Sequence, residues 1–382
     1  MRIAARTVMV IAGLLLATRA LALETEARSM LVMDHSSGIV LFAKNEAAPL
    51  PPASMSKLMT LYMVFEALRE GRLALDTEFR VSEKAWKMGG SKMFVEVGNQ
   101  VSVEDLLRGI IIASGNDACI VIAEGMSGTE RAFADAMTKR ARELGMMDST
   151  FRNATGWPHP EHLMSARDLV LIAGRIVSEF PEYYHYFAEK TFTWAGITQP
   201  NRNPLLFMDI GADGLKTGHT RQAGYGLVGS AERDGRRVVF AFTGMTSERA
   251  RSQEAERIVS WSFREFRSQE LFKAGAEIAR AELWLGQEAT VPLVPLRDVT
   301  IVRPYGKDPV KASVVYRGPI PTPVGEGQEL AELRLEIPGL APVSIPLAAG
   351  HAVPRGGFVA RLKASARLLA GKALSLAGQE QN

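Results

Sequence analysis

The stretch PPASMSKLMTLYMVFEALREG, residues 51–71, begins with two prolines and continues as an apolar helical pattern. Its apolar side chains recur three or four residues apart, which predicts a buried helix over 54–70 that Gly71 ends. Ser54 and Lys57 fall in the first turn of that helix, where residues three apart are neighbours. A cation in the first turn faces the positive end of the helix dipole, so helix stability alone does not explain Lys57.

The Ser54–Lys57 pair indicates nucleophilic chemistry. A serine hydroxyl is a weak nucleophile until a base takes its proton, and a lysine amine can be that base once its pKa is lowered. Burial, a second cation and a helix N-terminus each lower the pKa of a lysine. Because a Ser-x-x-Lys spacing also occurs by chance in many proteins, the hypothesis needs partners elsewhere in the chain.

Two later segments provide such partners. The segment IIIASGNDACI places Ser114 and Asn116 in the break between two apolar helical stretches, where polar side chains can face a cleft. The segment GADGLKTGHTRQAGYG places Lys216 and Thr217 on a strand after a glycine-rich turn, and Gly218 leaves the edge of that strand open to a substrate. Penicillin-recognising serine enzymes share these three motifs.

Strands and helices around these segments follow an α+β order. Residues 29–45 are typical of a β-hairpin with a Ser-Ser-Gly turn. Further strands are predicted at 214–220, 223–233 and 236–244. Helical patterns cover 103–112, 116–127, 130–145, 165–179 and 248–266. We predict one antiparallel sheet with helices on both faces for residues 23–270.

The composition changes beyond residue 270. Residues 271–352 consist of short alternating runs broken by proline and glycine, which predicts a small all-β sandwich domain. Residues 353–382 return to helical spacing, with apolar side chains at Phe358, Leu362, Leu369 and Leu376 and basic ones at Arg361, Lys363, Arg367 and Lys372. This pattern is typical of a helix that lies in a membrane interface. A solvated tail is the alternative, because Gly371 interrupts the helix.

The N-terminus has the pattern of a secretory signal peptide over residues 1–22. Arg2 and Arg6 precede an apolar run, and Ala20-Leu21-Ala22 fits a small-residue cleavage site. The run is shorter than the roughly 20 residues that span a bilayer. We therefore expect a mature chain that works outside the cytoplasm, with an uncleaved anchor as the alternative because of Arg19.

The composition of the whole chain argues against some classes of function. With 382 residues, 47% of them hydrophobic, the chain can bury one large core and a smaller second one. Its 45 basic and 42 acidic residues leave a formal charge of +3, which argues against nucleic-acid binding. The single cysteine, Cys119, cannot form an internal disulfide and is expected in the core.

The chain resembles the low-molecular-mass penicillin-binding proteins, the D-alanyl-D-alanine carboxypeptidases of the peptidase S11 family. The likeness runs from SGIVLFAKNEAAPLPPASMSKLMT through GSKMFVEVGNQVSVEDLLRGIIIASGNDAC to DGLKTGHT, and extends to the β-domain and the basic tail. It implies a serine β-lactamase/penicillin-binding-protein-like transpeptidase fold, without a cofactor or metal. It also implies removal of the terminal D-alanine from peptidoglycan stem peptides that end in D-Ala-D-Ala, and acylation by β-lactams. In relatives the tail is a peripheral anchor to the inner membrane, which implies a periplasmic enzyme.

The resemblance also implies a role for each motif residue. Ser54 is the expected nucleophile and Lys57 its general base. Ser114 is expected to relay a proton toward the leaving amine, and Asn116 to hold Lys57 and the substrate amide. Lys216 is expected to keep the local field positive beside Ser114.

The same resemblance implies the substrate-binding residues, which are Lys216, Thr217, Gly218, His219, Arg251 and Ser91. The backbone N–H groups of Ser54 and His219 are expected to form an oxyanion hole. Thr217 and Arg251 are expected to hold the free carboxylate of the last D-alanine, with Arg249 as the competing candidate. Ser91 is expected on a loop that borders the site.

Two alternatives keep the same motifs. A class A-like β-lactamase carries a glutamate that hydrolyses the acyl-enzyme, and the nearest counterpart here is Glu161, four residues before Ser165. Ser165 is better explained as a helix cap. A non-catalytic cell-wall scaffold that keeps the fold is the other alternative, although a binding protein has no need of every motif residue.

A zinc peptidase is a third alternative, with a different mechanism. His159, Glu161 and His162 contain metal-ligand residue types at close spacing. Pro160 breaks the helix that would place both histidines on one face, and no third ligand is evident, so we expect loop histidines and no metal.

Overall fold

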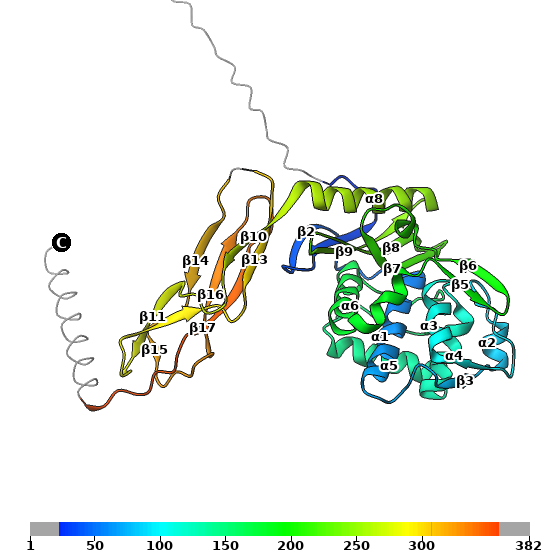
Figure 1. Cartoon of the computed structure of the whole chain (residues 1–382), viewed down its shortest axis with the longest axis horizontal. Helices are drawn as coiled ribbons and strands as arrows, with labels where there is room; N and C mark the ends of the chain where they lie inside the picture. The colour runs from blue at the N-terminus through cyan, green and yellow to red at the C-terminus, as the bar shows by residue number, and fades with distance from the viewer. Residues whose placement is uncertain (1–22, 307, 359–382) are drawn as a thin grey trace, which may run out of the picture.

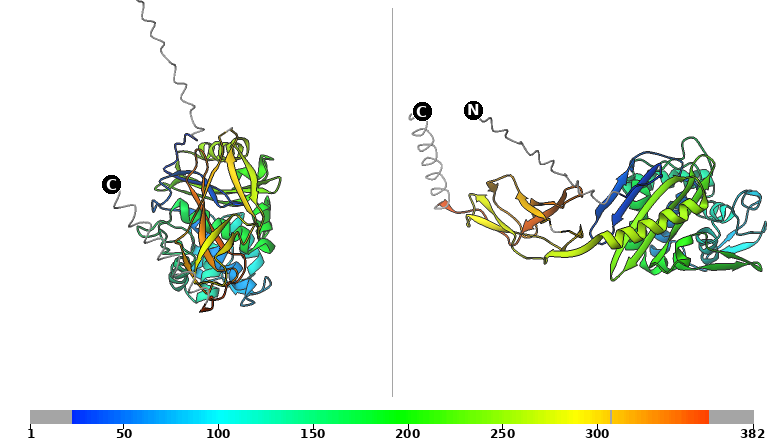
Figure 2. Two further views of the ribbon diagram at one scale, coloured as in Figure 1. Left: turned by 90° about the vertical axis from the view of Figure 1, so that its left-hand side faces the viewer. Right: turned by 90° about the horizontal axis from the view of Figure 1, so that it is seen from above.

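The computed structural model describes residues 23–306 and 308–358. An N-terminal α+β unit and a C-terminal β unit follow each other in an elongated molecule (Figures 1 and 2). They are joined where helix α8 (Glu248–Glu265) leads directly into strand β10 (Phe266–Phe272). The β unit therefore starts ahead of the boundary expected at residue 271, and residues 359–382 of the predicted tail lie outside the described residues.

A five-stranded antiparallel sheet forms the centre of the N-terminal unit, in the order β2-β1-β9-β8-β7. Its strands are β1 (Ser29–Asp34), β2 (Ile39–Lys44), β7 (Ala212–Thr220), β8 (Gly224–Arg233) and β9 (Arg236–Met245). Strand β1 pairs with β9, so the early hairpin joins the late strands as predicted. Strand β7, which carries the Lys-Thr-Gly segment, is one edge of this sheet.

Side chains alternate between the two faces of the sheet. Leu31 packs into a core with the helices α1 to α6, whereas its neighbours Met30 and Val32 pack on the other side with α8. The larger helices are α1 (Lys57–Arg69), α3 (Val103–Ile111), α4 (Asn116–Ser127), α5 (Glu130–Glu143) and α6 (Ala166–Glu179). Helices on both faces of one antiparallel sheet confirm the predicted fold class.

Helix α1 is buried on nearly all sides, which explains its apolar sequence. Its beginning differs from the prediction. Residues Ala53–Ser56 form a separate 3₁₀ turn, and the α-helix starts at Lys57. Because residues three apart eclipse each other in a 3₁₀ turn, this start places Ser54 and Lys57 on the same side of the chain.

Several short elements have no counterpart among the predicted ones. They are α2 (Glu83–Lys87), α7 (Pro181–Tyr184), the hairpins β3–β4 (Glu78–Arg80, Gln100–Ser102) and β5–β6 (Thr191–Trp194, Ile197–Pro200), and two 3₁₀ turns (His185–Ala188, Pro204–Phe207). Each is too short to give a clear hydrophobic period. The second 3₁₀ turn contacts the edge strand β7.

The C-terminal unit is all-β, as predicted. A six-stranded sheet has the order β14-β16-β17-β12-β11-β15, and β10 pairs with β13 in a second, two-stranded sheet. The further strands are β11 (Ala279–Trp284), β12 (Thr290–Val294), β13 (Val299–Pro304), β14 (Lys311–Val315), β15 (Ile320–Pro321), β16 (Glu329–Glu336) and β17 (Val343–Ala349). Figure 1 shows the last described residues at the end of this unit remote from the N-terminal unit.

A buried arginine connects the sheet to the junction between the two units. Arg236, at the start of β9, pairs with Asp34 at the end of β1, with 2.5 Å between Nε and Oδ2. Its Nη1 donates to the carbonyl oxygens of Ser262 at 2.9 Å and Phe266 at 3.0 Å. One side chain thus contacts the sheet, the end of α8 and the first residue of β10.

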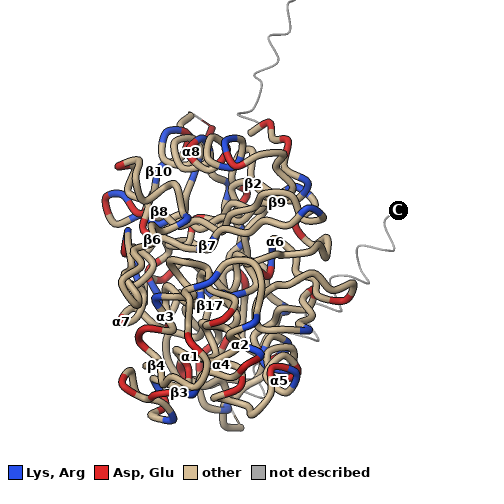
Figure 3. The backbone as a smooth tube through the Cα atoms, turned by 90° about the vertical axis from the view of Figure 1, so that its right-hand side faces the viewer, with Lys and Arg blue, Asp and Glu red and all other residues tan. Residues whose placement is uncertain are grey.

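Charged residues of both signs are interspersed along the chain (Figure 3). Within 23–306 and 308–358, no helix is long and apolar enough to cross a bilayer.

Candidate active site

Ser54 lies in the 3₁₀ turn at the start of the buried helix α1. The Lys57 ammonium group donates to the Ser54 hydroxyl, with 2.8 Å between Nζ and Oγ. Ala53, directly before the serine, has a positive φ of 50°, which is unusual for a residue with a side chain. The expected contact between hydroxyl and amine is therefore present, and the backbone that carries the serine is locally constrained.

Lys57 is fully buried and has three hydrogen-bond partners. Besides Ser54, its Nζ contacts Oδ1 of Asn116 at 2.8 Å and the carbonyl oxygen of Thr155 at 2.7 Å. Burial lowers the pKa of Lys57 to about 8, because the charged form loses its hydration. A substantial share of the amine is consequently neutral near pH 8.

The neighbours of Lys57 orient its lone pair. A neutral amine has two N–H bonds and one lone pair. The carbonyl oxygens of Asn116 and Thr155 can only accept hydrogen bonds, so they take both N–H groups. The Asn116 amide is itself oriented, because its Nδ2 donates to the carbonyl oxygen of Gly89 at 2.8 Å. The lone pair is left to face the Ser54 hydroxyl, which is the arrangement that a general base needs.

Lys216 is a second buried lysine, and it lies beside Ser114. Its Nζ donates to the Ser114 hydroxyl at 3.0 Å and to the carbonyl oxygen of Thr217 at 3.3 Å. Burial lowers the pKa of Lys216 well below its usual value, and the charges of Lys57 and Arg202 lower it further. Ser114 has a positive φ of 58° in the break between α3 and α4. The three motifs therefore meet at one place.

Gly218 allows β7 to approach the serine turn. A Cβ at this position would lie 2.9 Å from the carbonyl oxygen of Pro52 and 3.2 Å from the backbone nitrogen of Met55. The structure thus adds a reason for the glycine, namely the close approach of protein backbone, and its expected role toward a substrate stays a prediction. His219 follows on the same strand, with its ring stacked on Tyr225 at 3.8 Å between centroids.

The two candidate arginines of α8 differ in burial. Arg251 is 4% exposed, its Nη2 pairs with Glu248 at 2.7 Å, and its charge contributes to the lowered pKa of Lys216. Its buried Nε has no hydrogen-bond partner in the described parts of the chain. Arg249 is exposed to solvent. Arg251 is thus the guanidinium close to the site, with one donor unused.

Ser91 makes hydrogen bonds with both the Ser-x-Asn segment and a further arginine. Its carbonyl oxygen accepts from the backbone N–H of Asn116 at 2.7 Å, and its hydroxyl accepts from Nη1 of Arg202 at 2.7 Å. The charge of Arg202 lowers the pKa of both Lys57 and Lys216. Arg202 was missed in the sequence because it stands in a loop outside every motif.

The Thr155 carbonyl was also missed, since a backbone acceptor leaves no side-chain signature. The turn that carries it is ordered by Asn153, whose Oδ1 accepts from the backbone N–H groups of Thr155, Gly156 and Trp157. An asparagine with a glycine three residues later is typical of a turn, and this was the available signal.

The residues of the alternative mechanisms have other partners. The Glu161 side chain is 66% exposed and pairs with Arg152 at 3.2 Å. His162 is buried between two partners, with Nε2 2.8 Å from the Ser56 hydroxyl and Nδ1 accepting from the backbone N–H of Arg152. No group of three metal-ligating side chains occurs in the residues that the structure describes. Ser165 caps α6, since its hydroxyl accepts from the backbone N–H of Asp168.

Comparison with known proteins gives two family matches. Residues 16–246 match the peptidase S11 model for D-alanyl-D-alanine carboxypeptidases, and residues 266–355 match the C-terminal domain of penicillin-binding protein 5. The chain belongs to the peptidase S11 family. It is a serine D-alanyl-D-alanine carboxypeptidase of the penicillin-binding proteins, as the sequence predicted.

Individual relatives are similar in sequence or structure over most of the chain. D-alanyl-D-alanine carboxypeptidase DacC of Escherichia coli is 35% identical over 346 residues, which cover 88% of this chain and 86% of the relative. The relative DacF of Bacillus subtilis is 33% identical, covering 88% of each chain. The crystal structure of penicillin-binding protein 5 from Haemophilus influenzae superposes with a TM-score of 0.80 at 34% identity, and covers 87% of this chain and 98% of that one.

Replacing Gly156 by alanine should damage this carboxypeptidase through the Ser54 turn. A Cβ at Gly156 would lie 1.9 Å from the carbonyl oxygen of Ala53, so the two turns must separate. We expect the rate of penicillin acylation to fall by about tenfold or more, as a displacement of about 1 Å can cost up to about 100-fold.

Gly128→Ala is the matched control for this test. Gly128 has a φ of 74°, close to the 79° of Gly156, but a Cβ there would meet nothing within 4 Å. Both variants carry a backbone cost of about 1–3 kcal/mol. Equal acylation rates in the two variants would contradict the prediction.

Proposed function

We propose that the enzyme removes the terminal D-alanine from peptidoglycan stem peptides that end in D-Ala-D-Ala, through an acyl-enzyme on Ser54. The observation that carries this proposal is the contact between the buried Lys57 amine and the Ser54 hydroxyl. A lysine with a pKa of about 8 can accept the serine proton near neutral pH, whereas an ordinary lysine cannot.

Acylation proceeds in two steps. The Ser54 oxygen attacks the carbonyl carbon of the penultimate D-alanine while its proton passes to Lys57. The bond from that carbon to the nitrogen of the last D-alanine then breaks. The proton that Lys57 took passes through the Ser114 hydroxyl to the leaving amine, which returns Lys57 to its neutral form. The hydrogen bond from Lys216 to Ser114 supports this relay. In deacylation, water attacks the ester carbonyl and Lys57 accepts the proton of that water. The proton then passes to the Ser54 oxygen as the ester bond breaks.

Two groups of donors stabilise the substrate. The backbone N–H groups of Ser54 and His219 bind the oxyanion, and one such donor contributes about 2.7–4 kcal/mol of barrier lowering. Thr217 and Arg251 bind the free carboxylate of the last D-alanine. The unused Nε of Arg251 and its burial beside the site support this role, since a guanidinium can bind a carboxylate with two parallel hydrogen bonds.

β-Lactams acylate the same serine. Penicillin-binding protein D2 of Listeria monocytogenes, with a TM-score of 0.59 at 29% identity, has been solved in ampicillin-bound and cefotaxime-bound forms. Attack by Ser54 on the lactam carbonyl opens the ring, and the amine formed stays attached to the acyl group. Because Glu161 pairs with Arg152 at the surface, we expect slow release of the acyl group rather than rapid hydrolysis.

The Ser54→Ala variant tests the nucleophile. It should lose both covalent labelling by a fluorescent penicillin and release of D-alanine from a peptide ending in D-Ala-D-Ala, with thermal unfolding unchanged. Ser56→Ala, which removes the neighbouring hydroxyl that contacts His162, is the control and should still be labelled. A covalent penicillin adduct on the Ser54→Ala protein would disprove the assignment.

The pH dependence of acylation tests the base. Below pH 8 most of Lys57 is protonated and has no lone pair, so the second-order acylation rate constant should rise with pH and level off above about 8. Well below the pKa the neutral fraction changes about tenfold per pH unit. The measurement is stopped-flow acylation from pH 6 to 10, with unfolding followed over the same range. A rate constant that stays flat across this range would exclude Lys57 as the base.

We further propose that the enzyme is periplasmic and peripherally attached to the inner membrane. The signal-peptide pattern of residues 1–22 supports export, and the basic amphipathic pattern of the tail supports attachment. Each lysine or arginine near an anionic surface contributes about 1 kcal/mol, so the four cations of the tail give weak and reversible binding.

Co-sedimentation with vesicles tests the attachment. The chain from residue 23 should pellet with anionic vesicles at low salt and be released at high salt. A chain that ends at Pro354 should stay in the supernatant, with unchanged activity on a small peptide. Replacing Arg361, Lys363, Arg367 and Lys372 by glutamine in the full chain separates charge from length. Equal partitioning of all three proteins would rule out the tail as an anchor.

A further inference from the structure

The turn whose Thr155 carbonyl accepts from Lys57 is fixed by hydrogen bonds to two helices. The carbonyl oxygen of Ala154 accepts from the hydroxyl of Thr60 on α1 at 2.8 Å. The backbone N–H of Ala154 donates to Oε1 of Glu130, the first residue of α5, at 3.2 Å. The residue before the Thr155 carbonyl is therefore fixed from both sides.

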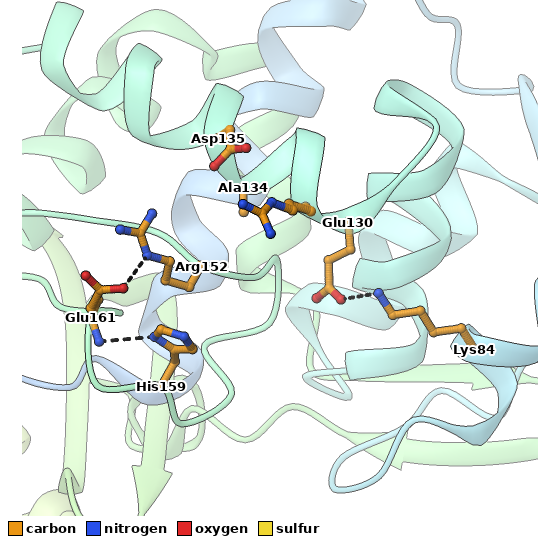
Figure 4. A pocket seen from close by; sticks show the side chains of 8 residues that line it. Lys84, Glu130, Ala134, Asp135, Arg152, His159 and Glu161 are labelled. Atoms are coloured by element: carbon orange, nitrogen blue, oxygen red, sulfur yellow. Dashed lines mark hydrogen bonds and ion pairs between the residues drawn. The ribbon is translucent and has the colours of Figure 1, made fainter.

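A lysine on the opposite wall orients the Glu130 carboxylate. Oε2 of Glu130 pairs with Nζ of Lys84 on α2 at 2.6 Å, which leaves Oε1 for Ala154 (Figure 4). The Glu130 side chain is 13% exposed and that of Lys84 is 55% exposed. Helix α2 leads into Gly89, whose carbonyl oxygen accepts from Asn116. The pair thus connects the segment that orients Asn116 with the turn that carries Thr155, and these two residues are the acceptors of Lys57.

The space behind this turn is a polar pocket. Lys84, Glu130, Asp135, Arg152 and His159 are among the side chains that line its volume of about 530 Å³. The side chains that line the pocket are mostly charged, whereas Ala154 itself is fully buried among the apolar side chains of the core. On the pocket side, the Glu130 hydrogen bond is the direct contact with Ala154.

We propose that Glu130 is a positioning residue for the general base. Its hydrogen bond to the Ala154 N–H keeps the Thr155 carbonyl on Lys57, and that carbonyl takes one of the two N–H groups of the neutral amine. Without it the amine rotates, and its lone pair leaves the Ser54 hydroxyl. This inference rests on the proposed role of Lys57. Its consequence is a slower acylation step with unchanged non-covalent binding.

Variants that also lack the Lys84 charge test the hydrogen-bond acceptor at position 130 apart from its ion pair. In Lys84→Met, the side-chain oxygen of a glutamine at position 130 has no cation to attract it and is free to accept from Ala154. We compare Lys84→Met with its double variants Glu130→Gln and Glu130→Met. Asp135→Ala is the control, because it removes a carboxylate from the same helix and pocket, and the Asp135 side chain makes no hydrogen bond or ion pair within the described residues. Penicillin acylation is resolved into the dissociation constant and the first-order rate constant.

We expect the first-order rate constant of the Glu130→Met double variant to be about tenfold or more below that of Lys84→Met, with the dissociation constant within about twofold. The Glu130→Gln double variant should stay within about threefold of Lys84→Met, and Asp135→Ala within about threefold of wild type. A merely structural role would not distinguish glutamine from methionine in this way. If the methionine double variant does not fold, Glu130→Ala with Lys84 intact replaces it.

Two results would overturn the proposal. One is an equal first-order rate constant in the glutamine and methionine variants. The other is a loss that appears only in the dissociation constant. A wild-type protein that penicillin does not acylate, or a Lys57→Met protein that is acylated normally, would contradict the proposed function instead, so the two failures are distinguishable.

Discussion

The withdrawal of the Lys57 amine from water is the constraint on which the site depends. Burial removes the hydration of the charged form, and three oxygen atoms at 2.7–2.8 Å from Nζ take the place of water as hydrogen-bond partners. These oxygens come from the serine turn, from α4 and from a loop that lies more than 90 residues after Lys57 in the chain. The sheet and its helices are needed because no local segment could bring all three together.

The charge on one buried lysine also affects the pKa of the other. A positive charge on Lys57 lowers the pKa of Lys216, because two ammonium groups in one buried site repel each other. By the proposed role of Arg251, a substrate carboxylate bound there would offset this excess of positive charge. Burial and the charge of Arg202 favour a neutral Lys57, and the cations around Lys216 favour an anionic ligand beside it.

The sequence was informative where chemistry depends on side chains at fixed spacing. Ser54, Lys57, Ser114, Asn116 and Lys216 could be named from motifs, and the long elements from their apolar periodicity. The backbone carbonyl of Thr155 and the loop residue Arg202 could not be named, because their contacts depend on how distant loops fold. A further reason for Gly218 was also out of reach, since only the packing of β7 against the serine turn shows which backbone atoms its missing side chain would meet.

The position of Arg236 has a practical consequence for dividing the chain. Its guanidinium uses the carbonyl oxygen of Phe266, which belongs to the first residue of the C-terminal unit. Phe266 also packs against Trp261 of α8 in a T-shaped, edge-to-face arrangement, with 4.9 Å between ring centroids. A protein cut at the end of α8 would lose an acceptor for a buried cation and an aromatic contact together. The boundary of a catalytic fragment is therefore better set beyond Phe266 than at the last helical residue.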